Sequence, residues 1–170
     1  MKSGEITGKR IKSVSNFISK EGMNCSNARL LPSDSVVIAL NGRGKTRGTT
    51  AILDFECSCN QSVVCISPNS KEELNTEFLH YYLSYLYEFI RNLTGDNDRS
   101  GLSMAKIRQI PLMIPKIMEQ IEIGNALQGL DNKIEILENK KQILTALFKT
   151  LLHELMTGQR RVHEVEFAFL

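Results

Sequence analysis

The residues best suited to chemistry lie in a glycine-rich stretch at residues 39–46, which reads ALNGRGKT. Its last three residues match the end of a phosphate-binding loop, in which backbone N–H groups and a lysine hold nucleotide phosphates. Such a loop also needs a glycine at the position of Ala39 and a helix directly after Lys45. The segment that follows, TRGTTAILDF, is β-branched and interrupted by Gly48, so it predicts a strand. The sequence therefore disfavours a nucleotide-using enzyme.

The same loop carries three basic residues, Arg43, Lys45 and Arg47, between small ones. Small residues allow the backbone to approach a ligand closely, while lysine and arginine bind phosphates and guanine edges. Residues 1–60 hold nine Lys/Arg against five Asp/Glu, whereas the rest of the chain has a slight acidic excess. This local excess, more than the formal net charge of +2, favours a polyanionic partner. The alternative is a solvent-exposed hairpin tip without a ligand.

Other groups with chemical potential are few. The cysteines show neither paired C-x-x-C spacing nor a companion histidine cluster, which predicts no metal site and reduced thiols in or near strands. They are Cys25, Cys57, Cys59 and Cys65. His80 is expected to be structural, and no nucleophile is paired with a base. No apolar run reaches the ~18 residues of a membrane span, and the N-terminal residues lack a secretory signal, so we expect a cytoplasmic protein.

The elements that must position the basic loop are short. Apolar, β-branched runs predict strands at residues 35–40, 49–55 and 62–67, with the loop between the first two. A helix is expected over residues 75–93, capped by Asn75 or Thr76, and Ser103 is expected to cap one short helical turn. Pro111 and Pro115 bracket residues 112–114, which predicts a short edge strand. Residues 1–29 show no clear pattern. The class indicated is α+β.

Toward the C-terminus the pattern becomes a heptad repeat. Apolar residues alternate at spacings of four and three, interrupted by one polar member, and predict a long coiled-coil helix over residues 116–157. The members of this seam are Ile123, Leu127, Leu130, Ile134, Leu137, Lys141, Leu144, Phe148, Leu151 and Leu155. The seam would extend ~48 Å, which is too long for the interior of so small a domain. The alternative is one amphipathic helix packed on its own domain. Gly158 is expected to end the helix, leaving residues 158–170 as a tail.

Five segments together resemble the specificity subunit of type I DNA restriction-modification enzymes, over about residues 28–162. They read LLPSDSVVIALNGRGKTRGTTAIL, CNQSVVCISP, TEFLHYYL, GLSMAKIRQIPLMIPKIMEQIEIGNALQGLDNKIEILENKK and LLHELMTGQRRV. The resemblance implies a small mixed target-recognition domain over residues 1–115, without the segment that usually opens it. The family's long spacer helix, over residues 116–157, would follow.

The resemblance also implies a non-catalytic subunit that reads duplex DNA. Methyltransferase and restriction subunits would bind S-adenosylmethionine and ATP respectively, so no cofactor is expected in this chain. The residues to which DNA contact is carried over are Arg43, Lys45, Thr46, Arg47, Asn60, Gln61, Arg99, Lys106 and Arg108. The alternative function is a coiled-coil protein-interaction scaffold without DNA specificity.

Complete members of the family pair two such helices antiparallel, whereas this chain has one, so an antiparallel homodimer is expected. Centred near residue 139, it would place Lys141 beside the partner's Glu138. The two reading domains would lie ~40–50 Å apart, more than one ~34 Å turn of duplex. A symmetric dimer would therefore read two inverted half-sites separated by unread base pairs.

Overall fold

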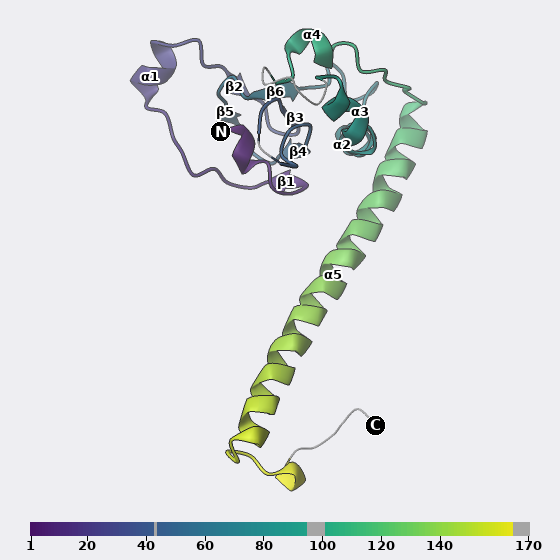
Figure 1. The fold of residues 1–170 in the computed structure, drawn as a ribbon. Helices are drawn as coiled ribbons and strands as arrows, with labels where there is room; N and C mark the ends of the chain where they lie inside the picture. The colour runs from purple at the N-terminus through teal and green to yellow at the C-terminus, as the bar shows by residue number, and fades with distance from the viewer. Residues whose placement is uncertain (43, 95–100, 165–170) are drawn as a thin grey trace. The chain divides into compact units, whose positions relative to one another are not determined.

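The computed structural model describes residues 1–42, 44–94 and 101–164 (Figure 1). The chain divides into two compact units, residues Met1–Leu127 and Gln128–Leu170. Among the described residues, the first unit contains every strand and five of the helical segments, and the long helix begins within it. A small sheet with helices, followed by one long helix, confirms the α+β class.

A four-stranded sheet with the order β1-β4-β3-β6 forms the centre of the first unit. Its strands are β1 (Arg10–Ile11), β3 (Val36–Ala39), β4 (Thr50–Leu53) and β6 (Val63–Ile66). β3 pairs antiparallel with β4 and β6, and β1 pairs parallel with β4. A separate antiparallel pair joins β2 (Leu30–Leu31) to β5 (Cys57–Ser58). The three strands expected from the apolar runs are confirmed, each slightly shorter than the run.

Both faces of the sheet are covered, which explains why every residue of β3 and β4 is buried rather than every second one. On one face the buried core includes Val36, Ile38 and Ile52 with helical residues such as Leu79 and Leu83. The core on the other face is built from the alternate strand residues and from the N-terminal segment. It contains Met1, Ile6, Ile11, Val37, Ala39, Ala51, Leu53, Cys57 and Val63. Residues 1–29, which show no pattern in the sequence, thus contribute to the second core.

Two helices replace the single helix expected over residues 75–93. α2 (Thr76–Tyr85) begins where expected, because Oδ1 of Asn75 accepts a hydrogen bond from the N–H of Phe78 at 3.0 Å. The chain then breaks at Leu86, whose φ of −82° and ψ of 10° lie outside the helical region, and continues as α3 (Tyr87–Asn92). The prediction of one continuous helix was therefore wrong at this residue.

Shorter elements complete the first unit. They are the 3₁₀ turn η1 (Ser3–Glu5), α1 (Lys20–Asn24) and α4 (Met104–Ile107). Oγ of Ser103 accepts a hydrogen bond from the N–H of Lys106, which confirms the expected cap. The edge strand expected at residues 112–114 was wrong, because this segment pairs with no strand. Instead, the N–H of Met113 donates to Oη of Tyr82 at 3.3 Å.

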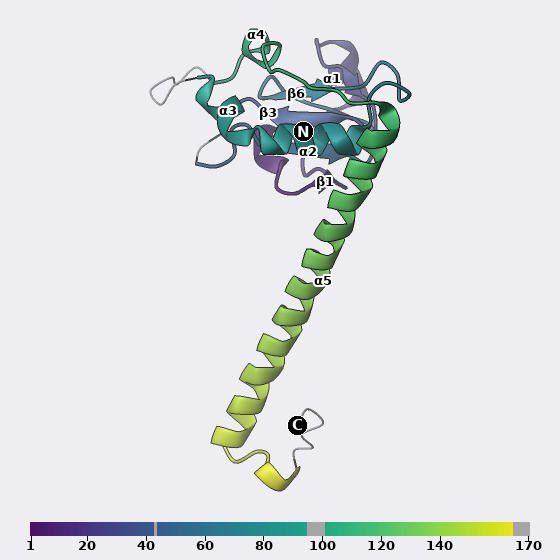
Figure 2. The ribbon, with the colours of Figure 1, turned by 90° about the vertical axis from the view of Figure 1, so that its right-hand side faces the viewer.

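The long helix α5 (Ile117–Met156) contains the whole heptad seam and is followed by Gly158, with a φ of 73°. Figure 2 shows α2 lying along the sheet between α3 and the first turn of α5. Many apolar side chains along α5 are exposed, including Ile143 at 68% and Phe148 at 64%. None of the helices, within the described ranges, combines the length and apolar character needed to cross a membrane.

Candidate nucleic-acid interface

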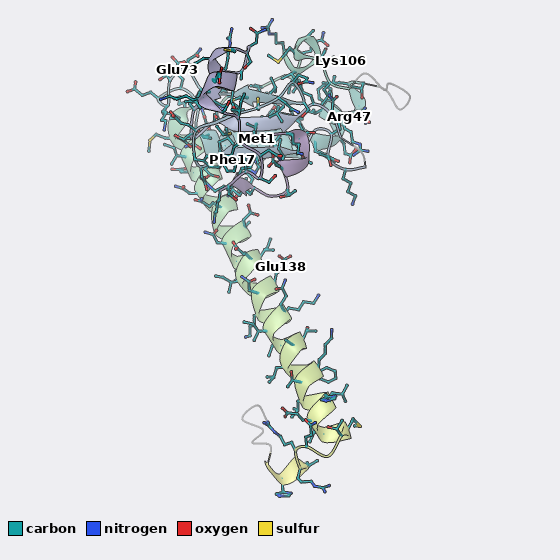
Figure 3. All side chains as sticks on the ribbon, turned by 90° about the vertical axis from the view of Figure 1, so that its left-hand side faces the viewer. Met1, Phe17, Arg47, Glu73, Lys106 and Glu138 are labelled. Atoms are coloured by element: carbon teal, nitrogen blue, oxygen red, sulfur yellow. The ribbon has the colours of Figure 1, made fainter. Side chains whose placement is uncertain are left out.

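The antiparallel register brings several loops to one end of the sheet. Ala39, the last residue of β3, pairs with Val63, the first of β6, and Ile38 pairs with Thr50, the first of β4. The N–H of Leu102 also donates to the carbonyl of Leu40 at 3.0 Å. We call this region the loop end, comprising residues 40–42, 44–49, 60–62, 87–94 and 101–108. In Figure 3, Arg47 and Lys106 lie toward this end, whereas Glu73 lies at the opposite one.

The β3–β4 loop has a defined backbone. The N–H of Gly48 donates to the carbonyl of Ala39 at 2.9 Å, and Oγ1 of Thr49 donates to the carbonyl of Thr46 at 2.7 Å. Gly44 and Gly48 adopt φ values of 61° and 83°, where glycine is favoured. The loop continues into β4 rather than into a helix. It therefore lacks the helix N-terminus that a nucleotide-binding loop requires.

The loop is held by the first residue of α3, Tyr87, and by Thr94, which follows the helix. Oη of Tyr87 donates to the carbonyl of Lys45, and Nη1 of Arg91 donates to Oη of Tyr87, each at 2.7 Å. Nη1 of Arg47 donates to Oγ1 of the buried Thr94 at 2.8 Å. The sequence analysis missed Tyr87 and Arg91 as site residues, although their spacing of four on a helix places them side by side.

The structure brings most of the predicted contact residues to the loop end. Lys45 is exposed, and Thr46 and Arg47 are half-buried. The β5–β6 turn presents Asn60 and Gln61, both exposed. Oδ1 of Asn60 accepts hydrogen bonds from the N–H of Ser62 at 3.1 Å and from its hydroxyl at 2.5 Å, which fixes that side chain in the turn.

The remaining predicted residues divide into two groups. Lys106 lies within α4 and Arg108 directly after it, next to Ile107, which belongs to the same core cluster as Leu40. Lys106 is half-buried and Arg108 is exposed. Arg43 and Arg99 lie outside the described residues.

Three basic residues of the loop end, Lys45, Arg47 and Arg91, form no ion pair with a described carboxylate. Arg47 and Arg91 donate to hydroxyl groups, and no Asp or Glu with a described position lies within ion-pair distance of Lys45, Arg47 or Arg91. Positive charge that no ion pair neutralises attracts anions. The loop end therefore has the electrostatic character of a polyanion-binding surface.

The opposite end of the sheet, which we call the root end, comprises residues 9–10, 34, 54, 71–77 and 115–124. Here Arg10 bonds Asp54 and Glu77, Lys9 lies 3.2 Å from Glu77, and Lys71 pairs with Asp34. Burial acts to lower the pKa of Arg10, but the hydrogen bonds to both carboxylates outweigh it and raise the pKa. The positive charges of Lys9, Arg10 and Lys71 are therefore neutralised within the fold.

The first turns of α5 are fixed at the root end by Gln120, which is 0% exposed. Its Oε1 accepts from the N–H of Asn75 at 2.9 Å, and its Nε2 donates to the carbonyls of Glu73 at 2.9 Å and Pro115 at 2.8 Å. One turn later, a Cβ added to Gly124 would lie 3.2 Å from Cβ of Glu77. The small residue allows the helix to approach α2 closely.

The thiols and histidines offer little chemistry. Cys57 lies in β5, Cys65 in β6 and Cys59 beside them, as expected, and burial raises the pKa of all three. The expectation was wrong for Cys25, which is exposed at the end of α1. His80 is buried, with Nδ1 3.3 Å from Oγ1 of Thr50, as a structural residue would be. The described part of the chain contains no group of His, Cys, Asp or Glu that could hold a metal ion.

Two curated sequences are similar to this chain over much of its length. The MjaVIII specificity subunit of a type I restriction enzyme from Methanocaldococcus jannaschii is 26% identical over 166 residues, covering 94% of this chain. A second M. jannaschii sequence, designated the MjaX specificity subunit, is 29% identical over 115 residues, covering 68% of this chain. The chain spans only 39% and 27% of the lengths of these curated relatives.

The fold of this chain is similar to that of a solved structure. The S subunit of a type I restriction-modification system from M. genitalium aligns with a TM-score of 0.56 and 21% identity, over 72% of this chain and 32% of that one. The family model for the type I restriction modification DNA specificity domain matches residues 2–146. Since that match covers most of the sequence, this chain belongs to the type I restriction modification DNA specificity family.

Proposed function

We propose that this chain reads a specific duplex DNA sequence within a type I restriction-modification complex. The observation that carries the proposal is the loop end, where Lys45, Arg47 and Arg91 gather and none of them forms an ion pair with a described carboxylate. Phosphate contacts supply most of the affinity for duplex DNA, and contacts to base edges supply specificity. The loop end offers groups of both kinds.

Lys45 and Arg47 are assigned to phosphates, because both are cationic and neither is neutralised by a described carboxylate. Thr46, Asn60 and Gln61 are assigned to base edges, because hydroxyl and amide groups present the donors and acceptors that distinguish base pairs in the major groove. Lys106 and Arg108 extend the surface along α4. Arg43 and Arg99 are retained as contacts on the strength of the family resemblance.

α5 is proposed to serve assembly rather than DNA reading. Exposed apolar patches of this extent are typical of protein–protein interfaces, and the heptad spacing suits another helix. We assign its seam to an antiparallel homodimer and to docking of the methyltransferase subunits, with restriction subunits as further members of the complex. S-adenosylmethionine and ATP would be bound by those subunits, so this chain performs no chemical step.

The register of the homodimer is proposed to depend on Lys141, which is exposed and interrupts the apolar seam. A single polar residue at a seam position fixes register at a cost in stability. Lys141→Leu is expected to strengthen dimerisation and to permit alternative registers, measured by analytical ultracentrifugation and by cysteine cross-linking along α5. Unchanged dimer affinity and cross-linking would contradict the pairing of Lys141 with the partner's Glu138.

The test of the function is selection from a randomised duplex library at two salt concentrations, with and without methyltransferase subunits. A two-part motif with a fixed gap is the expected result, and it would support the antiparallel dimer as well. A single half-site would retain DNA reading but argue against the dimer. Absence of enrichment under all conditions would overturn the proposal in favour of a protein-interaction scaffold.

A further inference from the structure

The hydrogen bonds between α3 and the β3–β4 loop centre on the hydroxyl of Tyr87. Oη of Tyr87 takes part in two hydrogen bonds, donating to the carbonyl of Lys45 and accepting from Nη1 of Arg91, both at 2.7 Å. The guanidinium carbon of Arg91 also lies 5.8 Å from the centre of the Tyr87 ring. One hydroxyl thus links the backbone that carries Lys45 to a second cation.

A parallel contact lies beside it. Nη1 of Arg47 donates to Oγ1 of Thr94, and that hydroxyl donates to the carbonyl of Arg91 at 3.1 Å. The loop backbone also approaches α3 closely, because a Cβ added to Gly48 would lie 3.6 Å from side-chain atoms of Tyr87 and Ile90. Hydrogen bonds therefore connect the guanidinium groups of Arg47 and Arg91 with the backbone of the loop that carries Lys45.

The hydrogen bonds leave most of the guanidinium donors unused. An arginine has five N–H donors, and the side chains of Arg47 and Arg91 each make a single described hydrogen bond, to a neutral hydroxyl. Neutral partners orient a guanidinium without cancelling its charge, whereas Arg10 at the root end is neutralised by two carboxylates. Two oriented guanidinium groups and an exposed lysine suit the phosphates of a nucleic-acid backbone.

We propose that Arg91 is a phosphate-binding residue and that Tyr87 is a positioning residue, which joins the end of α3 and the β3–β4 loop into one phosphate-binding surface. This inference rests on the proposed function and adds residues that the sequence did not indicate. Arg91 contacts a phosphate directly. Tyr87 acts through Lys45 and Arg91, by holding their relative positions when the duplex binds.

The test is a salt titration of the full chain with a fluorescent duplex of random sequence. The logarithm of the affinity falls with the logarithm of salt concentration by ~0.9 for each phosphate neutralised. Arg91→Gln is expected to reduce this slope by about one unit, which corresponds to roughly tenfold weaker binding at 0.1 M salt. Arg91→Lys keeps the charge and is expected to restore the slope.

Tyr87→Phe removes both hydrogen bonds of the hydroxyl, which support Lys45 and Arg91, and is expected to weaken binding roughly 2- to 10-fold while the slope stays unchanged. Tyr85→Phe is the matched control, because Tyr85 is 83% exposed and has no described hydrogen bond from its hydroxyl. Lys71→Gln is the control for charge, because Lys71 is paired with Asp34 at the root end. Neither control is expected to change affinity or slope by a measurable amount.

Each outcome bears on one of the two proposals. If the unsubstituted chain does not bind duplex DNA even at low salt, the proposed function fails, and this inference with it. If it binds but Arg91→Gln keeps the slope, or Lys71→Gln lowers it equally, the role of Arg91 is overturned. If Tyr87→Phe binds as Tyr85→Phe does, Tyr87 is not a positioning residue. Thermal unfolding of each variant shows whether a loss of binding reflects a loss of fold. If Arg91→Gln does not fold, the salt slope of Arg91→Lys is the measurement that tests the role of Arg91.

Discussion

The two ends of the central sheet carry comparable positive charge but use it differently. Lys9, Arg10 and Lys71 at the root end are paired with Asp54, Glu77 and Asp34. Arg47 and Arg91 at the loop end bond hydroxyl groups instead, and Lys45 offers only its backbone carbonyl to Tyr87. A count of basic residues would not distinguish the two regions. The hydrogen-bonding partner of each cation distinguishes them, because a carboxylate neutralises the charge of the side chain, whereas a hydroxyl only orients the side chain.

This difference separates two kinds of consequence. Substitutions at the root end remove interactions that the folded state needs, so they are expected to change the free energy of unfolding. Substitutions at the loop end remove groups whose charge remains available to a ligand, so they are expected to change binding. Measurements of stability and of duplex binding on single variants test that separation.

The largest effect is expected at Gln120. Gln120→Leu would remove the side chain that bonds one backbone N–H and two backbone carbonyls, which are partly buried around the fully buried Gln120. An unsatisfied buried group costs ~1–3 kcal/mol, so for three partly buried groups we expect a loss of roughly 3 kcal/mol in the free energy of unfolding, measured with urea. Gln142→Leu is the matched control, because Gln142 is exposed on the same helix. Similar small effects at both positions would show that Gln120 does not hold the root end together.

The sharpest test compares two arginines that the sequence alone cannot tell apart. Arg10→Met removes the partner of Asp54 and of Glu77, whose side chain is only 16% exposed. Lys9 remains near Glu77, so a loss of ~1–3 kcal/mol in stability is expected, below the cost of breaking a fully buried pair. Arg91→Met is expected to change stability by no more than ~0.5 kcal/mol while it weakens duplex binding.

Both variants are measured by urea unfolding and by the salt titration. Equal losses of stability would remove the distinction between the two ends. Weaker duplex binding by the Arg10 variant than by the Arg91 variant, at equal folded fraction, would reverse it.

These contrasts also show what the sequence can and cannot provide. Continuous apolar runs predict β3, β4 and β6, and the side chains of Asn75 and Ser103 cap helices where expected, because these features depend on local interactions. The heptad seam is visible for the same reason. The sequence likewise places the basic loop between two strands, which is where the structure has it.

The features that could not be predicted from the sequence depend on contacts between distant segments of the chain. Gln120 resembles any polar residue on an amphipathic helix, and it is buried only because α5 meets backbone atoms of Glu73 and Asn75. Arg10 has partners 44 and 67 residues away, and Arg91 bonds Tyr87, whose hydroxyl reaches the backbone of Lys45 across 42 residues of sequence. Residues 112–114 are apolar between prolines, yet no strand is available for them to pair with. The position of the basic loop could thus be predicted from sequence, but the hydrogen-bonding partners of its cations could not.

The smallest expected effect concerns the support of the loop end by the N-terminal segment. Carbonyl oxygen of Met1 accepts from the N–H of Asn60 at 3.0 Å, and Oγ of Ser62 accepts from the N–H of Ser3 at 3.0 Å. η1 and the residues before it are therefore hydrogen-bonded to the turn that presents Asn60 and Gln61. Its own conformation depends on Glu5, whose carboxylate accepts from the N–H and hydroxyl of Ser15, each at 2.7 Å, and from the N–H of Lys2 at 2.8 Å.

These hydrogen bonds, chiefly the one from the backbone of Ser15, lower the pKa of Glu5 to about 2 from an ordinary value of 4.5. A carboxylate with a lowered pKa contributes stability above pH 4.5 and loses it as the pH falls toward 2. Glu5 is only partly buried, so water screens the effect, and Glu5→Gln is expected to cost no more than ~1 kcal/mol at neutral pH. Urea unfolding at stepped pH should show the difference between the two proteins shrinking below pH 4.5 and vanishing near pH 2. A difference that is independent of pH would mean that the shape of Glu5, rather than its charge, supports η1, and the Asn60 turn would then be insensitive to acid through this residue.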